Sequence, residues 1–114
     1  MLLDPTLIPG LSAAAAAAAK GAPFADLFSH RRSRASVARA RQLAVYLHHV
    51  ALGASVSACA KAFARDRATV RHACATIEDL RDDPLFDAGA RRLETALAAQ
   101  RDMICALLAQ GSAQ

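Results

Sequence analysis

The chain has 114 residues, of which 54% are hydrophobic and only 4% aromatic, and its formal net charge is +4. This length suits one domain with a modest core, and the scarcity of aromatic residues argues against a surface that stacks single-stranded bases. No apolar run approaches the roughly 18 residues that a membrane-spanning helix needs, so we expect a cytoplasmic protein without a membrane partner.

The first third of the chain predicts a lead-in, one helix and one short turn. Residues 1–11 contain two prolines and a glycine and therefore favour a flexible lead-in. Ser12 is a suitable N-cap for a helix that runs through an alanine tract to Lys20, and Gly21 is typical of a helix end. Pro23–Phe28 then predicts a short turn or helix, which an arginine-rich linker follows.

The middle of the chain predicts two helices. Apolar residues recur at helical spacing from Val37 to about Ala51, and Gly53 ends this helix. Five apolar residues form its expected buried face: Ala40, Leu43, Ala44, Leu47 and Val50. Four residues form its expected exposed face: Arg39, Gln42, Tyr46 and His49. Ser55 is the expected N-cap of a short helix that ends near Ala62.

The last third predicts two further helices. Asp66 occupies an N-cap position, and the helix it starts has a buried stripe of five apolar residues: Val70, Ala73, Cys74, Ile77 and Leu80. This helix ends near Arg81, and the Asp83-Pro84 pair is typical of the start of another. Five apolar residues of the last helix are expected to be buried: Phe86, Leu93, Leu97, Ile104 and Leu108. They either close the core or form a homodimer seam or a partner surface.

These elements predict an all-α fold, a compact helical domain of five or six helices over residues 12–110 with a tail at 111–114. The chain has three cysteines, Cys59, Cys74 and Cys105, which are widely spaced and include no CxxC pair. We therefore expect reduced thiols that act as small apolar side chains, with no disulfide and no catalytic role.

The basic residues are concentrated in one part of the chain. Between residues 31 and 72, nine lysines and arginines accompany one aspartate, which gives +8 (9 − 1), whereas residues 1–30 sum to −1 and residues 73–114 to −3. Such a block favours a side that faces a polyanion. It is centred on a short helix, a tight turn and a longer helix at about residues 55–81, which is a helix-turn-helix pattern.

Four short motifs follow one another in this segment: ARQLAVYL, SVSACAKAF, RDRATV and HAC. Their order and spacing resemble the C-terminal DNA-binding domain of the bacterial chromosomal replication initiator DnaA, and also small stand-alone proteins of that type. The resemblance covers about residues 31–83. It implies that the helix beginning at Asp66 enters the major groove of duplex DNA and that the basic loop before Val37 holds phosphates.

Thirteen residues are expected to bind DNA on these grounds. Arg65 and Arg67 each offer a fork to guanine, Thr69 offers a methyl or a hydroxyl group, and Asp66 caps the helix or accepts from a cytosine amine. Six residues suit backbone contacts, which fix register without reading sequence: Arg31, Arg32, Arg34, Arg39, Arg41 and Gln42. Three more complete the expected interface: Lys61, Arg71 and His72.

Several positions depart from the pattern of the full-length initiators. The turn after Phe63 is one residue shorter, and Ala64 replaces a glycine there. Arg67 replaces a histidine, Ala68 the first threonine and Arg71 an aliphatic residue. Because one bidentate base contact is worth about 1–3 kcal/mol of discrimination, these changes predict a related but altered or weaker sequence preference.

No enzyme activity and no cofactor are expected. The chain lacks the GxxxxGK[ST] loop with which the initiator's ATPase module cradles phosphate. The adjacent His48 and His49 point to different faces of a helix, so they are not expected to bind a metal together.

The leading hypothesis is a nucleoid-associated duplex DNA-binding protein that modulates replication initiation or transcription. The alternative is a protein-interaction module that binds the initiator or another regulator, with vestigial DNA binding. Charge reversal at Arg65 and Arg67 separates them, because only DNA binding requires those side chains.

Overall fold

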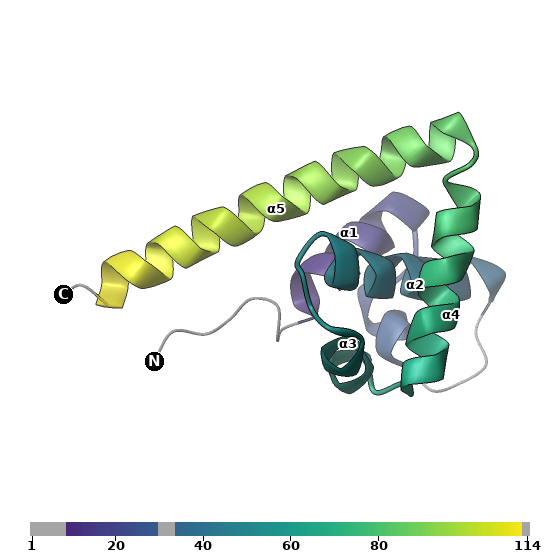
Figure 1. Ribbon diagram of the computed structural model, residues 1–114, viewed down its shortest axis with the longest axis horizontal. Coiled ribbons are helices and arrows are strands. Elements are labelled where there is room, and N and C mark those ends of the chain that lie inside the picture. Colours follow the sequence, from purple (N-terminus) through teal and green to yellow (C-terminus); the bar gives the residue numbers. More distant parts are fainter. Residues whose placement is uncertain (1–8, 30–33, 113–114) are drawn as a thin grey trace.

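The computed structural model describes residues 9–29 and 34–112 (Figure 1). The described residues form α-helices and one 3₁₀ helix and include no strand, which confirms the all-α class. The elements in chain order are α1 (Gly10–Lys20), η2 (Phe24–Phe28), α2 (Ala35–Val50), α3 (Val56–Phe63), α4 (Arg67–Leu80) and α5 (Pro84–Ser112).

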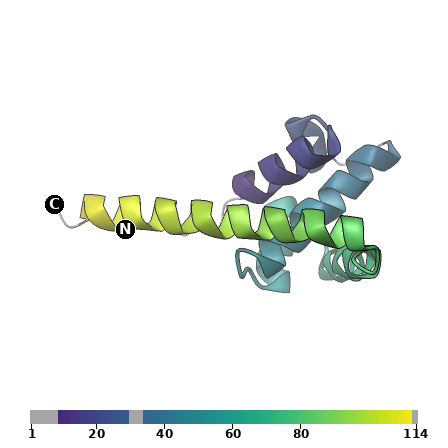
Figure 2. The same cartoon turned by 90° about the horizontal axis from the view of Figure 1, so that it is seen from above.

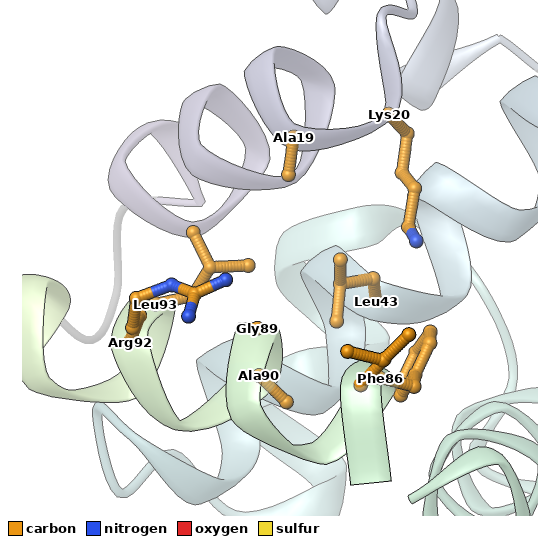
Figure 3. Close-up of a pocket in the computed structure, with 9 residues that line it drawn as sticks. Ala19, Lys20, Leu43, Phe86, Gly89, Ala90, Arg92 and Leu93 are labelled. Atoms are coloured by element: carbon orange, nitrogen blue, oxygen red, sulfur yellow. The ribbon is translucent and has the colours of Figure 1, made fainter. Parts of the chain in front are cut away.

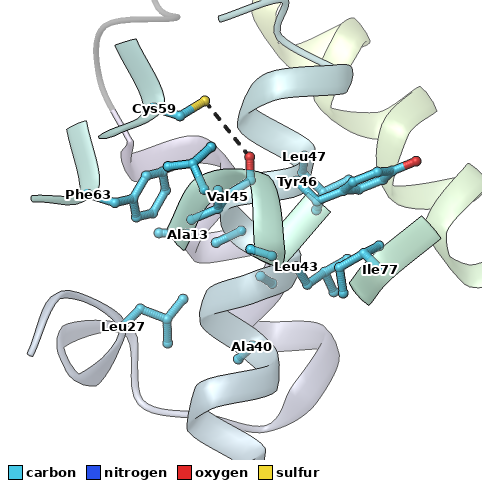
Figure 4. Packing of buried hydrophobic residues seen from close by; sticks show 14 of the residues in the cluster. Ala13, Leu27, Ala40, Leu43, Val45, Tyr46, Leu47, Cys59, Phe63 and Ile77 are labelled. Atoms are coloured by element: carbon cyan, nitrogen blue, oxygen red, sulfur yellow. Dashed lines mark hydrogen bonds between the residues drawn. The ribbon is translucent and has the colours of Figure 1, made fainter. Parts of the chain in front are cut away.

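Helix α2 is the centre of the fold and packs against each of the other elements (Figure 4). Its Leu43 and Leu47 are almost fully buried, as are Leu27 from η2 and Phe63 from α3. The Phe63 ring stacks on Phe28, with the ring centroids 5.6 Å apart. These contacts bring η2, α2 and α3 into one apolar core.

The alanine tract of α1 packs closely on α2. Ala13, Ala16 and Ala17 are buried, and a left-handed Gly21 ends the helix as the sequence predicts. Small side chains let two helix backbones approach each other, and alanine loses no rotamer freedom on burial. This explains how a helix without a strongly apolar stripe contributes to the core.

The expected role of Ser12 was wrong, because α1 begins at Gly10 and has Pro9 at its N-cap position. Ser12 lies inside the helix and is fully buried. Its hydroxyl donates to the Pro9 carbonyl at 3.2 Å and lies 3.2 Å from Nδ1 of the buried His48. The serine therefore joins α1 to α2, a tertiary role that its local sequence does not reveal.

Two expected faces of α2 were also wrong in part. Tyr46 was placed on the exposed side but is only 2% exposed, and Val50 was placed on the buried side but is 43% exposed. The Tyr46 ring belongs to the apolar core, and its hydroxyl bonds to Glu78 of α4 and to Arg81, the residue that follows α4. Val50 lies in the last turn of α2, where the chain turns away toward α3.

Arg81 joins three helices at the junction between α4 and α5. Its guanidinium donates to Asp87 Oδ1 at 2.6 Å, to Glu94 Oε1 and to the Tyr46 hydroxyl at 2.9 Å. Tyr46 in turn donates to Glu78 Oε1 at 2.8 Å, and burial together with this bond raises the pKa of Tyr46 to about 12. The start of α5 is thereby anchored to α2 and α4.

Helix α5 extends past the rest of the molecule (Figures 1 and 2). It begins at Pro84, where Asp83 Oδ1 accepts the backbone N–H of Leu85, and it packs on the core through Leu97. Its 29 residues correspond to a length of about 43 Å. Across residues 9–29 and 34–112, no helix is both long and apolar enough to cross a membrane.

Candidate nucleic-acid interface

The pair α3 and α4 forms a helix-turn-helix with a three-residue turn. Ser55 caps α3 by accepting the N–H of Ala58 at 3.0 Å, as expected. Asp66 caps α4 by accepting the N–H of Thr69 at 2.7 Å, and this bond lowers the pKa of the Asp66 carboxyl. The predicted caps at both helix starts are therefore confirmed.

The N-terminal half of α4 presents a polar and basic outer face. Arg67, Ala68, Arg71 and His72 are exposed, whereas Val70 is fully buried against the core. Recognition helices of helix-turn-helix proteins contact base edges with such N-terminal residues. The exposed face of α4 therefore has the position and charge that duplex recognition needs.

The charge on α4 changes sign along the helix. Glu78 and Asp79, which are exposed, follow the basic first half. Glu78 also accepts the Tyr46 hydroxyl, so it belongs to the junction with α5. The positive charge of α4 is therefore confined to its first half.

Arg65 and Arg41 differ from the exposed arginines, because both guanidinium groups donate to backbone carbonyls. Arg65 bonds to the carbonyls of Phe63, Ala64 and Ser29 at 3.1, 3.2 and 2.6 Å. Arg41 bonds to the carbonyls at the end of η2, with the nearest, Leu27 O, at 2.7 Å. The acceptors are main-chain atoms, which leave no signal in the amino-acid sequence.

A small hollow of about 130 Å³ lies between α2 and the start of α4. Four of the predicted DNA-binding residues line it: Arg41, Gln42, Arg65 and Thr69. Residues that are far apart in sequence therefore meet beside the helix-turn-helix. The fold brings these four residues together around one hollow.

The other predicted site residues lie around this centre or outside the described part. Arg34 is exposed at the N-cap position of α2, and Lys61 is exposed on α3. Arg39 is half-buried, and its Nη1 atom is buried with no hydrogen-bond partner among the described residues. Arg31 and Arg32 lie outside the described residues.

A second hollow lies away from the helix-turn-helix, between α1 and α5 (Figure 3). It measures about 320 Å³, and Leu43 of α2 lies between the two helices. The Lys20 Nζ atom sits over the Phe86 ring, 4.7 Å from its centroid. In the chain that the structure describes, no cluster of three histidine, cysteine or acidic residues is suited to a metal ion.

The turn stores backbone strain at Ala64, which has a φ of 53° and a left-handed conformation. Such a conformation costs a residue with a Cβ atom about 1–2 kcal/mol and suits glycine. We expect Ala64→Gly to raise the unfolding free energy by about 0.5–1 kcal/mol in urea denaturation. Ala62→Gly, inside α3, is the matched control and is expected to lower it. If both variants lowered the unfolding free energy by the same amount, the strain at Ala64 would be contradicted.

Comparison with known families supports this geometry. Residues 14–77, which are 64 of the 114, match the family model described as the bacterial DnaA protein helix-turn-helix. The match runs from α1 to the last turn of α4 and so includes α2, α3 and the turn. No solved structure matches the chain.

Proposed function

Because the chain belongs to the bacterial DnaA helix-turn-helix family, we propose that it binds duplex DNA with the first half of α4 in the major groove. The observation that carries this proposal is the exposed face of α4, where Arg67, Arg71 and His72 point outward beside a firmly capped helix start. Arginine forks suit guanine edges.

The surrounding basic residues supply phosphate contacts in this proposal. Lys61 on α3 and Arg34 at the start of α2 are exposed, and their charges add to those of Arg31 and Arg32 in the sequence. Phosphate contacts of this kind fix the register of the protein without reading sequence. In this proposal, Thr69 and Asp66, which lie beside Arg67 at the start of α4, contact neighbouring base edges.

The biological role that we propose is occupancy of sites related to the initiator box, by which the protein modulates replication initiation or transcription on the nucleoid. Its recognition positions differ from those of full-length initiators at Arg67, Ala68 and Arg71. These differences lead to a related but altered or weaker preference for DNA sequence. The protein acts without catalysis, by occupying such sites itself or by helping the initiator to occupy them. The alternative function is that of a protein-interaction module that binds the initiator or another regulator, with vestigial DNA binding.

The test is binding to an initiator-box duplex and to a scrambled duplex over a salt series. We expect log K to fall with log salt by about 0.9 per neutralised phosphate, and the box to be preferred. Equal affinity for the two duplexes would leave a phosphate-binding protein without sequence preference. Absence of binding at physiological salt would favour the protein-interaction alternative.

We also propose that the projecting part of α5 forms a homodimer. Met103 and Leu107 are 65% and 61% exposed, and no charged residue occurs from position 103 to 112. A second α5 offers the same uncharged apolar surface, so two copies cover each other without leaving a charge buried.

Sedimentation equilibrium tests this dimer. We expect a mass that rises with concentration above the 12.0 kDa of one chain. The change Met103→Glu with Leu107→Glu is expected to restore the monomer, because burying two unpaired carboxylates is unfavourable. Ala88→Glu with Thr95→Glu, which adds the same charge to exposed positions nearer the start of α5, is expected to leave association unchanged. A monomeric mass for the unaltered chain at all concentrations would refute the dimer.

A further inference from the structure

Two arginines from distant parts of the chain donate to the same backbone oxygen. The Ser29 carbonyl accepts Nη2 of Arg65 at 2.6 Å and Nη2 of Arg41 at 3.3 Å. Ser29 follows the last residue of η2, Arg41 belongs to α2, and Arg65 lies in the turn before α4. One oxygen atom therefore connects three elements of the fold.

Other bonds of the two guanidinium groups to described residues extend this connection. Arg41 also donates to the carbonyls of Leu27 at 2.7 Å and Asp26 at 3.0 Å, which belong to η2. Arg65 also donates to Phe63 and Ala64, where α3 ends. The last carbonyls of a helix have no partner within it, so the two arginines satisfy acceptors at the ends of both η2 and α3.

The closeness of two positive groups has an electrostatic consequence. Burial lowers the pKa of Arg41, and the neighbouring charge of Arg65 lowers it further. Both guanidinium groups carry a positive charge, as arginine side chains in proteins do. Hydrogen bonds from each planar guanidinium group to several carbonyl oxygens offset the repulsion between the two charges. The arrangement therefore depends on the shape of the guanidinium group and not on positive charge alone.

We infer that Arg65 is a positioning residue, which with Arg41 holds the α3–α4 turn against η2 and so sets the direction of α4. Asp66, the next residue, caps α4 through the N–H of Thr69, and Arg67 begins the helix. A shift of the turn is thus transmitted directly to the side chain of Arg67. In its consequence for DNA, this inference rests on the function proposed above. It assigns to Arg65 a role different from the guanine contact expected from sequence.

Lysine substitutions test the inference because lysine keeps the charge and lacks the planar fork. The variants are Arg65→Lys, Arg41→Lys and the double change, with Arg92→Lys on the exposed surface of α5 as the matched control. The first measurement, made without DNA, is amide hydrogen exchange at Thr69 and Val70 in the first turn of α4, with Ala16 of α1 as an internal reference for global stability. The second is the ratio of affinities for the initiator-box and scrambled duplexes.

We expect amide exchange at Thr69 and Val70 to rise about tenfold in each single variant, the size of one lost hydrogen bond. The double variant is expected to show nearly the same exchange rates as each single variant, because the two arginines act as one unit. The affinity ratio is expected to fall about tenfold in each single variant. Amide exchange at Ala16 is expected to stay unchanged in every variant. Arg92→Lys is expected to change neither the amide exchange nor the affinity ratio.

Two results would overturn the inference. Loss of the affinity ratio in Arg65→Lys alone, with unchanged exchange and an unaffected Arg41→Lys, would make Arg65 a direct reader of bases. Unchanged exchange and an unchanged ratio in both variants would leave the shared carbonyl without a positioning role. If the unaltered chain binds no duplex, the proposed function fails, and the exchange measurement still decides whether Arg65 and Arg41 hold α4.

Discussion

Duplex binding is expected to weaken by at least about 100-fold at physiological salt when Arg67 and Arg71 are both changed to glutamate. Both residues are exposed on α4, so the fold is expected to survive the change. Each substitution turns an attraction to phosphate or to a guanine edge into a repulsion. This pair is a cleaner choice than Arg65 and Arg67, because Arg65 donates to backbone carbonyls and its loss disturbs the turn.

Fluorescence anisotropy with a labelled duplex at several salt concentrations measures this effect. The slope of log K against log salt is expected to fall by about 0.9 for each lost phosphate contact. The matched control is Arg91→Glu with Arg92→Glu on α5, which also lowers the net charge from +4 to 0 (two changes of −2) on exposed residues. It is expected to weaken binding by less than about tenfold, through net charge alone. Equal effects of the two pairs would show that α4 is not the binding face.

Activity in cells separates the DNA-binding function from the protein-interaction alternative. If duplex binding carries the function, the change at Arg67 and Arg71 abolishes it. A cellular effect that persists when duplex binding is lost would favour a protein partner. The exposed arginines of α4 would then serve at most as a contact surface for an acidic partner.

The largest loss of stability is expected from Arg81→Met, at about 2–3 kcal/mol of unfolding free energy. Methionine fills most of the space of arginine but donates no hydrogen bond. The substitution removes the guanidinium that bonds to both Asp87 and Glu94, and it removes a donor to the Tyr46 hydroxyl. Asp87 keeps its pair with the exposed Arg91, whereas Glu94 loses the cation that it shares with Asp87. Urea denaturation measures the loss. Arg91→Met is the matched control, because Arg91 also pairs with Asp87 but its side chain is 75% exposed; its loss is expected to stay below about 1 kcal/mol.

The same substitution is expected to change how stability depends on pH. Bonding to Arg81 holds the pKa of the Asp87 carboxyl below its ordinary value. A carboxyl whose pKa is lower in the folded state stabilises the fold above its unfolded pKa, and this contribution disappears as the pH falls through the folded pKa. The difference in stability between the unaltered chain and Arg81→Met is therefore expected to shrink below about pH 4. A difference that is constant from pH 7 to pH 3 would contradict the role of the Arg81–Asp87 pair.

Local sequence signals predicted the helix boundaries well. Gly21, Ser55, Asp66 and Pro84 each mark the expected helix end or start in the structure. These signals work because capping and helix termination depend on a residue and its near neighbours. Ser12 misled because a serine inside a helix can bond to a neighbouring helix instead of capping its own.

The candidate site was predictable in its charge and only partly in its geometry. The exposed positions of Arg67, Arg71 and His72 follow from the helical period and from the buried Val70. The bonds of Arg41 and Arg65 did not follow, since their acceptors are main-chain oxygens that every sequence contains. The role of Arg65 thus changes from an expected base contact to a proposed support of the turn.

The amino-acid sequence by itself determined the all-α class, the helix-turn-helix and the concentration of positive charge around it. Spacing, caps and charge are properties of short segments, so they can be read in order along the chain. Only the tertiary structure decided that Tyr46 lies on the buried face of α2 and that Arg81 joins α5 to α4. It also decided that the Ser29 carbonyl accepts hydrogen bonds from two arginines. Apart from the Arg81–Asp87 pair, these contacts join residues more than ten positions apart, which become neighbours only when the helices pack.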